Sequence, residues 1–220
     1  LLAPSWGESA ILKKYGGRII DTLLATGDHI IIRPHPQSFR SEQDMMAKLM
    51  RAYPDSPQLE WNRDADNYDV RRSDILISDF SGVIFDFSLV YDKPVIYTDT
   101  DFDDAPYDAW WLDTPYWTFD VLPRIGQKLT EENMPRLREL IDACLRDPRY
   151  QAGRDEARAQ TWEHIGEGAR NTADYLERKL TELQGDNNRK LEEMRGIVDE
   201  KLQQTIQQRM NESFRLVSER

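Results

Sequence analysis

The sequence predicts an α/β fold in which a parallel sheet carries helices on both faces and a long amphipathic helix follows it. Three short apolar runs lead to this prediction, each followed by a polar loop: residues 30–32, 74–77 and 94–97. Stretches with helical character separate them, at 9–25, 41–52 and 82–91. Strand and helix alternate in this way in parallel sheets, where ligands bind at the carboxyl ends of the strands.

Two later stretches read as helices that close the domain. Residues 130–146 are predicted to be helical, with a capping box in which Asn133 replaces the usual acidic partner of Thr130. Residues 151–180 read as a further helical segment that is interrupted at 164–168.

Length, charge and cysteine content narrow the class of protein. The 220 residues leave room for one sizeable domain and an appendage, and the net charge of -11 argues against wide contact with nucleic acid. The single cysteine, Cys144, offers neither a disulfide within the chain nor a cysteine-based zinc site, which suits a reducing compartment. No apolar run reaches the ~18 residues that could span a bilayer. We therefore expect a cytoplasmic location, with peripheral contact at the inner face of the cell membrane left open.

Composition divides the chain into three expected segments: a domain at 1–183, a linker at 184–188 and an extended helix at 189–220. The linker is polar and contains Gly185, whereas 189–220 has no proline and one glycine. The chain also starts without Met and lacks a secretory signal, from which we expect a piece of a longer or processed protein.

The last segment carries a stripe of apolar residues with a mean spacing of about 3.7, closer to an eleven-residue repeat than to a heptad. Its members are Leu191, Met194, Val198, Leu202, Ile206, Met210, Phe214 and Val217. A helix of this kind needs a partner surface to bury its stripe, so self-association through 189–220, as a straight or slightly right-handed pairing, is expected.

The first group of residues that could carry chemistry stands at 78–87, between a predicted strand and a predicted helix. Small residues at a helix start let a diphosphate approach free backbone N–H groups. Ser78, Asp79, Ser81 and Gly82 are the candidates for this contact, and Asp86 is placed to reach ribose hydroxyls. The alternative is structural: Ser78 or Asp79 caps the helix and Asp86 is a polar surface residue.

The second group is Arg33-Pro34-His35-Pro36, directly after the first strand. A histidine at this point can act as a general acid or base near neutral pH, and an arginine can neutralise phosphate charge. The alternative is a turn made rigid by proline, with a surface histidine.

The segment 73–87, followed by Asp92-Lys93-Pro94 and an apolar run to Tyr97, resembles the CDP-glycerol glycerophosphotransferase family, the teichoic-acid and capsule polymerases and primases of the GT-B fold. Phe80 stands where the family has Tyr, and Gly82 where it has a second Ser. Residues 33–36 are similar to the family's R/K-P-H-P loop, and Leu2-Ala3-Pro4-Ser5-Trp6 to its A-P-T-W opening strand. The resemblance covers about residues 1–180 and implies the nucleotide-donor-binding, carboxyl-terminal half-domain.

The resemblance also implies an activity: transfer of glycerol phosphate, or a related polyol phosphate or sugar, from a CDP-activated donor to a growing cell-surface polymer. His35 would face the donor phosphates and Arg33 would neutralise the leaving nucleotide. No cofactor and no metal is implied. The polymer or lipid-linked acceptor would be held by an amino-terminal domain outside this chain, without which turnover is not expected.

Two other functions fit parts of the sequence. A non-catalytic nucleotide-binding or assembly module, made oligomeric by the helical tail, would need no acceptor half. A sugar-nucleotide epimerase of the same fold is the other alternative, because such enzymes carry related S-G-G and G-K-P elements. An enzyme of this class would prefer a UDP-sugar. A ligand titration separates all three.

Three features outside these groups are given structural readings. The Asp-rich, aromatic stretch 98–120 has no glycine for a calcium loop and is expected to tuck its aromatic rings onto the sheet, the alternative being an aromatic surface that faces the acceptor or a partner. His29 and His164 lack companions at metal-ligand spacing. Residues 187–220 are similar to the helical region that precedes the nuclease domain of the DNA recombination protein RmuC, but no nuclease residues follow.

Overall fold

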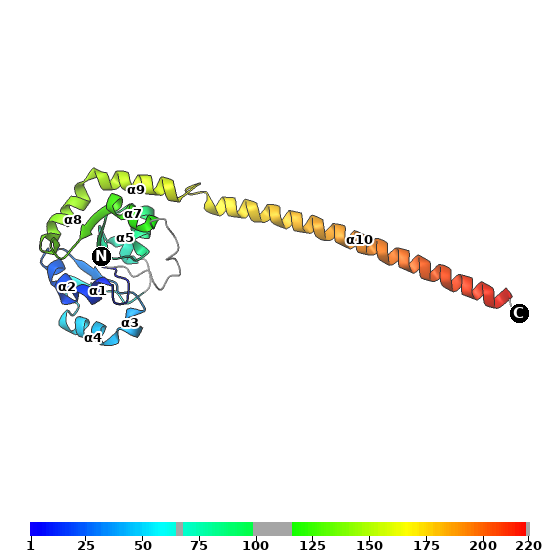
Figure 1. The fold of residues 1–220 in the computed structure, drawn as a ribbon, viewed down its shortest axis with the longest axis horizontal. Coiled ribbons are helices and arrows are strands. Elements are labelled where there is room, and N and C mark those ends of the chain that lie inside the picture. Colours follow the sequence, from blue (N-terminus) through cyan, green and yellow to red (C-terminus); the bar gives the residue numbers. More distant parts are fainter. Residues whose placement is uncertain (65–67, 99–115, 219–220) are drawn as a thin grey trace. The chain divides into compact units, whose positions relative to one another are not determined.

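The computed structural model describes residues 1–64, 68–98 and 116–218, and the chain divides into two compact units, Leu1–Trp162 and Glu163–Arg220. The first unit is a parallel sheet flanked by helices, as predicted (Figure 1). The second contains one long helix.

All strand pairs in the described part of the sheet are parallel. The strands are β1 (Ile30–Ile32), β2 (Leu59–Trp61), β3 (Leu76–Ser78), β4 (Val95–Thr98) and β5 (Gly126–Leu129). β1 pairs with β2, and β4 lies between β3 and β5. Leu2 forms parallel bridges with both Ile32 and Ile77, so the first residues of the chain join the two sets of strands.

The strand order is therefore β2, β1, the segment around Leu2, β3, β4 and β5. If the Leu2 segment counts as the first strand, this is the order 3-2-1-4-5-6 of doubly wound nucleotide-binding folds. The order reverses between the Leu2 segment and β3, and it is outside the carboxyl ends of the strands at such a point that these folds bind ligands.

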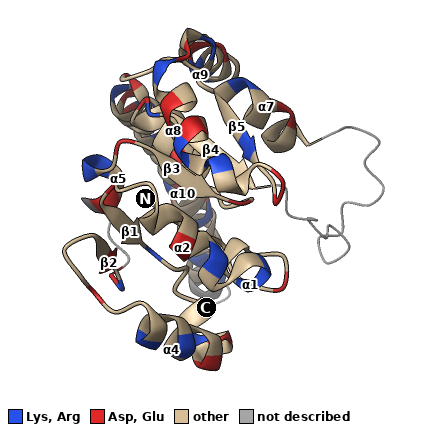
Figure 2. Cartoon of the chain, turned by 90° about the vertical axis from the view of Figure 1, so that its left-hand side faces the viewer, with Lys and Arg blue, Asp and Glu red and all other residues tan. Residues whose placement is uncertain are grey.

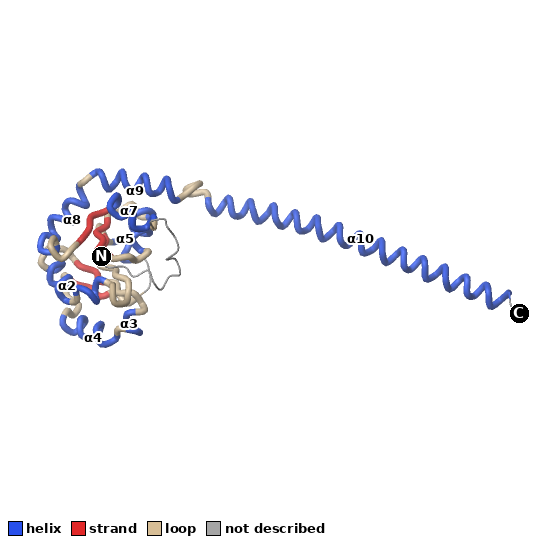
Figure 3. Tube along the Cα trace, in the orientation of Figure 1, coloured by secondary structure: helices blue, strands red, loops and turns tan. Residues whose placement is uncertain are grey.

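Helices connect the strands of the first unit (Figure 3). They are α1 (Ile11–Tyr15), α2 (Gly17–Leu24), α3 (Ser38–Ser41), α4 (Gln43–Ala52), α5 (Tyr68–Arg72), α6 (Val83–Phe85), the π-helical turn η1 (Asp86–Val90), α7 (Trp117–Ile125), the 3-10 turn η2 (Met134–Arg136), α8 (Leu137–Arg146) and α9 (Pro148–Thr161). The predicted helices at 9–25, 41–52 and 82–91 are confirmed, with a break at Gly16 and a π-helical turn as refinements.

Alternate residues along the strands face two separate apolar clusters, as expected for a sheet covered on both sides. Ile77 and Ile96 belong to a cluster with buried residues of α1, α2, α4 and α8. Leu76 and Val95 belong to the other, with residues of α5, α6, η1, α7 and α9. Burial on both faces explains why the strands read as continuous apolar runs.

The predicted capping box at Thr130 is present. The Thr130 N–H donates to Asn133 Oδ1 at 2.8 Å, and the Asn133 N–H donates to Thr130 Oγ1 at 3.3 Å. The helical turn that follows is the 3-10 turn η2 before it becomes α8.

The Asp92-Lys93 pair of the family-like segment has a structural role. The Lys93 ammonium donates to the carbonyl oxygens of Val70, Arg71 and Ser73, at 3.2, 2.6 and 2.6 Å, and so closes the end of α5. Asp92 has a φ of 56° and holds Arg154 and Arg158 of α9 against η1. These residues lock helices together behind the sheet.

The expected boundary at residue 183 is wrong, because the first unit ends at Trp162. The chain breaks at 163–167, where His164 and Gly166 have φ values of 53° and 83°. Residues 184–188 are not a linker but lie inside α10 (Gly168–Ser218), a single helix of 51 residues. One glycine and a few polar residues cost a helix only about 1 kcal/mol each, whereas two left-handed residues end it.

The described residues contain no helix long and apolar enough to cross a membrane. Basic and acidic residues are interspersed along α4, α8 and α9 (Figure 2). These helices therefore offer ion pairs rather than the basic stripe that nucleic-acid binding requires. The Asp-rich stretch 98–120 lies largely outside the described residues, so its expected packing stays a prediction.

Candidate functional site

Three loops leave the sheet where its strand order reverses. They follow the Leu2 segment, β1 and β3, and they carry Pro4–Gly7, Arg33–Pro36 and Asp79–Gly82. Because parallel strands place their carboxyl ends at one edge, the two groups of residues singled out in the sequence meet here.

Ser78 and Asp79 tie the first and third of these loops together. The Ser78 hydroxyl donates to the Ala3 carbonyl oxygen at 2.5 Å. The Asp79 carboxylate accepts from the Ser5 N–H at 2.9 and 3.1 Å and from the Ile11 N–H, at the start of α1, at 3.0 Å. Both side chains are buried and bound to the protein's own backbone. This is the structural alternative, since they shape the crevice instead of lining it with free polar groups.

Burial has the largest effect on the pKa of the Asp79 carboxyl. It raises the pKa of Asp79 above its ordinary value, although the hydrogen bonds from Ile11 and Ser5 favour the charged form and oppose the rise. Keeping this carboxylate buried costs free energy, but removing it would cost more, because the N–H groups of Ser5 and Ile11 would lose their acceptor.

A basic pocket of about 190 Å³ lies between the three loops. It is lined by Ala3, Pro4, Arg33, Pro34, His35, Pro36, Arg63, Asp64, Ser81 and Val83. The pocket thus brings together Arg33, His35 and Ser81, which the sequence placed about fifty residues apart. Two arginines and a histidine against one aspartate give it a positive balance, which favours an anion.

His35 is held in one orientation within this pocket. The Gln37 N–H donates to its Nδ1 at 3.1 Å, and its ring centroid lies 6.3 Å from that of Trp6. Since Nδ1 accepts a hydrogen bond, the proton of the neutral ring stands on Nε2. The free nitrogen of His35 is therefore a hydrogen-bond donor, which suits contact with a phosphate oxygen or protonation of a leaving group.

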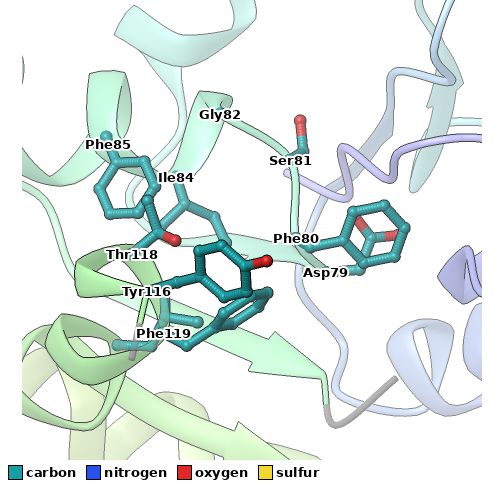
Figure 4. A pocket seen from close by; sticks show the side chains of 10 residues that line it. Asp79, Phe80, Ser81, Gly82, Ile84, Phe85, Tyr116, Thr118 and Phe119 are labelled. Carbon is teal, nitrogen blue, oxygen red and sulfur yellow. The ribbon is translucent and has the colours of Figure 1, made fainter. Parts of the chain in front are cut away.

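An aromatic pocket of about 370 Å³ lies on the other side of Ser81 and Gly82. Its lining residues are Asp79, Phe80, Ser81, Gly82, Ile84, Phe85, Tyr116, Thr118, Phe119 and Leu122. The rings of Phe80, Phe85, Tyr116 and Phe119 gather around it, and the Ser81 hydroxyl points away from them (Figure 4). Tyr116 and Phe119 pack edge to face, with centroids 6.0 Å apart. The pocket offers flat apolar surfaces of the kind on which a planar ring stacks.

Ser81 lines both pockets, and Gly82, the next residue, lines the aromatic pocket. The first hydrogen bonds of the helix begin one residue later, from the Ile84 N–H to the Ser81 carbonyl and from the Phe85 N–H to the Gly82 carbonyl. The N–H groups of Gly82 and Val83 therefore have no partner further back in the helix, which is the arrangement that receives anions. A side chain at residue 82 would meet nothing within 4 Å, so the approach to this backbone is open.

Asp86 is exposed at the start of η1, and it is not among the described residues that line either pocket. Its expected contact with ribose stays a prediction that this geometry does not favour. Arg63 lines the basic pocket without having been singled out in the sequence, and Tyr116 and Phe119, which line the aromatic pocket, were noted there only as part of the Asp-rich, aromatic stretch 98–120. Only the fold brings them to this edge, from the end of β2 and the start of α7.

Among the residues that the structure describes, no group of three or more His, Cys, Asp or Glu side chains could hold a metal ion. Cys144 is buried against the Val95 carbonyl, and burial raises the pKa of its thiol to about 11. It is a packing residue rather than a nucleophile.

The strand order and the crevice define a class: a doubly wound α/β domain with a phosphate-sized basic pocket at its switch point. The family model of CDP-Glycerol:Poly(glycerophosphate) glycerophosphotransferase matches residues 22–164, more than half of the 220 residues. This chain therefore belongs to that family. The matched range contains Arg33, His35 and the segment 73–97, but not the opening residues 2–6.

Among solved structures, the chain is similar to the glycosyltransferase VinC in complex with dTDP, at 13% identity and a TM-score of 0.44. The similarity covers 72% of this chain and 36% of that one, so the chain spans well under half of that structure's length. No curated protein sequence matches the chain.

Proposed function

We propose that the α/β unit binds the donor of a glycerophosphotransferase, CDP-glycerol or another CDP-activated polyol phosphate, at the border of the two pockets. The observation that carries this is the basic pocket, in which Arg33, His35 and Ser81 converge beside the free N–H groups of the helix start. The family membership names the chemistry that such a pocket would serve.

The two pockets divide the donor by its chemistry. The diphosphate would lie in the basic pocket, with Arg33 and Arg63 balancing its charge and the Gly82 and Val83 N–H groups donating to it. The cytosine ring would enter the aromatic pocket and pack on Phe80 or Tyr116. Ser81, which lines both, would contact the phosphate nearer the ribose.

His35 would assist the departure of CMP. With its proton on Nε2, it can donate to an oxygen of the phosphate that leaves, while Arg33 offsets the charge that develops there. The acceptor, a polymer or lipid-linked molecule, would be presented by an amino-terminal domain. The identity of the transferred group, a polyol phosphate, and its addition to a polymer are proposed together with the donor site. Peripheral location at the inner face of the membrane belongs to it as well.

Calorimetric titration of the chain with CDP-glycerol, CMP and a UDP-sugar tests the proposal. CDP-glycerol should bind. Arg33→Ala should weaken it roughly 10- to 100-fold, because a charge-assisted bond contributes about 1.5–3 kcal/mol, and Ser81→Ala only a few-fold. Arg51→Ala is the matched control, since Arg51 is exposed on α4 and lines neither pocket.

Two outcomes would overturn the proposal. Absence of binding for every nucleotide would leave the non-catalytic assembly module as the better account. Tighter binding of the UDP-sugar than of CDP-glycerol would favour the epimerase or a glycosyltransferase that uses a sugar donor.

A further inference from the structure

A polar groove of about 820 Å³ adjoins the basic pocket, and we call it the Trp6 groove. Its lining includes Trp6, Gly7, Lys13, Arg40, Glu42 and Asp44. The ring centroid of Trp6 lies 6.3 Å from that of His35, which lines the basic pocket. The three hollows therefore follow one another. The aromatic pocket meets the basic pocket at Ser81, and the basic pocket meets the groove where His35 contacts Trp6.

Hydrogen bonds to the backbone on both sides of Trp6 hold this residue at the border. The Ser5 N–H donates to Asp79, and the Gly7 N–H donates to Glu42 Oε1 at 3.2 Å. The Trp6 side chain is nevertheless 47% exposed, although most of the surface of a tryptophan is usually buried. A fixed backbone thus presents an open indole ring, on which the carbon atoms of a ligand can pack.

The charge of the groove differs from that of the basic pocket. Lys13 pairs with Glu8 at 3.1 Å. Of the other charged residues in the lining, Arg40 stands against Glu42 and Asp44. This negative balance disfavours a further phosphate and suits hydroxyl groups, which donate hydrogen bonds to carboxylates.

Glu42 gives an independent indication of a donor group in the groove. Its Oε2 atom is buried and accepts no hydrogen bond from the residues that the structure describes. A buried acceptor without a donor costs free energy, so such atoms are usually satisfied by the protein, by water or by a ligand. A ligand hydroxyl is a donor of the kind that this oxygen lacks.

We propose that the Trp6 groove binds the group that the donor transfers, an uncharged polyol or sugar. Its carbon chain packs on the Trp6 indole, and its hydroxyls donate to Glu42. This inference rests on the proposed donor site. With the base in the aromatic pocket and the diphosphate in the basic pocket, the group beyond the second phosphate passes His35 and enters the groove.

The size of the groove bears on the length of this group. The groove measures about 820 Å³ and the basic pocket about 190 Å³, so the groove has room for a polyol longer than glycerol. A five-carbon polyol places more C–H groups on the indole, and more hydroxyls beside the carboxylates, than glycerol does. The gain in affinity from the polyol should therefore grow with its length.

Calorimetric titration of the full chain with CDP-ribitol, CDP-glycerol and the methyl ester of CDP tests the inference. The methyl ester carries the same charge as the other two but has no group to fill the groove. CDP-ribitol should bind roughly tenfold more tightly than the methyl ester, and CDP-glycerol by a smaller factor. Trp6→Ala should reduce both factors to below about twofold, whereas Trp6→Phe, which keeps a flat ring, should retain most of each.

Trp117→Ala is the matched control. Trp117 is 36% exposed on α7 and lines neither the groove nor either pocket, so both factors should stay as in wild type. A second measurement follows the ring of Trp6 itself. Its indole N–H resonance, assigned by its loss in Trp6→Phe, should shift when CDP-ribitol binds and shift less with the methyl ester.

Three results would overturn the inference and leave the donor site standing. One is equal affinity for the methyl ester and CDP-ribitol. Another is a preference for CDP-ribitol that Trp6→Ala does not change. The third is binding of glycerol 3-phosphate at Trp6 in the presence of saturating CDP-ribitol, which would make the groove an acceptor site. Failure of all three nucleotides to bind would overturn the proposed function, and this inference with it.

Discussion

At the scale of single residues, the motif residues divide into those that line the basic pocket and those whose polar groups bond the backbone of the neighbouring loop. Arg33, His35 and Ser81 line the basic pocket, whereas Ser78 and Asp79 spend their polar groups on the backbone of the neighbouring loop. The sequence could not separate Ser78 and Asp79 from the ligand-facing residues, because they stand next to Ser81 in the same loop.

Asp92, like Ser78 and Asp79, uses its polar group to bond other parts of the protein, and the ionisation of its carboxyl allows a pH prediction. Burial opposes its ionisation, but hydrogen bonds from Arg154, Arg158 and Gln151 outweigh it and lower the pKa of Asp92 below its ordinary value. A lowered folded-state pKa means that the charged form stabilises the fold above the unfolded-state pKa, near 3.9, and that this contribution is lost as the pH falls below it.

We therefore expect Asp92→Asn to reduce the free energy of unfolding at pH 7 by about 1 kcal/mol, a low figure because the Asp92 side chain is 45% exposed. Asparagine tolerates the left-handed backbone of this position, so the loss reports charge. Urea denaturation from pH 7 to pH 3 should show the difference from wild type shrinking below about pH 4. Asp155→Asn, which removes an exposed partner of the same Arg158, is the control and should change stability by less than ~0.5 kcal/mol. A difference that persists unchanged at pH 3 would contradict this account.

At the scale of elements, glycines in two helices have opposite roles. Gly153 of α9 packs against α7, where an added Cβ would lie 1.9 Å from the Arg124 carbonyl oxygen. Gly185 of α10 has open space around it. The absence of a side chain is required at the first position and is only a loss of helix propensity at the second.

The same substitution should therefore act in opposite directions. Gly153→Ala should destabilise the first unit by about 1–3 kcal/mol, because α9 must move away from α7. Gly185→Ala should stabilise the helical state of α10 by up to about 1 kcal/mol and so increase its helix content. All six tryptophans lie at or before Trp162, so fluorescence follows the first unit while far-ultraviolet circular dichroism follows α10 as well. Equal effects of the two changes on the fluorescence transition would refute the distinction.

The length of the apolar pattern separates the elements that were predicted from those that were not. The long apolar periods of α2, α4 and α8 were visible in the sequence, and so was the Thr130–Asn133 capping box. β2 and β5 were missed, since Leu59–Trp61 and Gly126–Leu129 are too short and mixed to stand out. Their pairing with β1 and β4 makes them strands.

At the scale of the whole molecule, the division into two units falls at 163–167. Few interactions hold these residues, and Glu163 and Glu167 flank the left-handed His164 and Gly166. Exposed, irregular backbone of this kind is where proteases cut folded proteins first.

Brief digestion with a glutamyl endopeptidase should therefore release a stable fragment that ends at Glu163 or Glu167. Its unfolding transition, followed by tryptophan fluorescence, should match that of the intact chain, because the core clusters lie within the first unit. Replacing both glutamates by Gln should delay the cut. First cleavage within α8 or α9 would show instead that the boundary lies earlier.

The sequence alone determined the fold class, three of the five described strands with the helices between them, the resemblance to the family and the two loops that carry the candidate chemistry. These depend on local apolar periodicity and on motifs in a fixed order, which remain readable without contacts. The tertiary structure decided which motif side chains face the crevice, that Arg63 and Tyr116 join it, and where the domain ends. Those questions depend on contacts between residues far apart in the chain, which no local pattern records. The break at 163–167 was visible in the sequence as an interrupted helix, but only the contacts show that the first unit ends there.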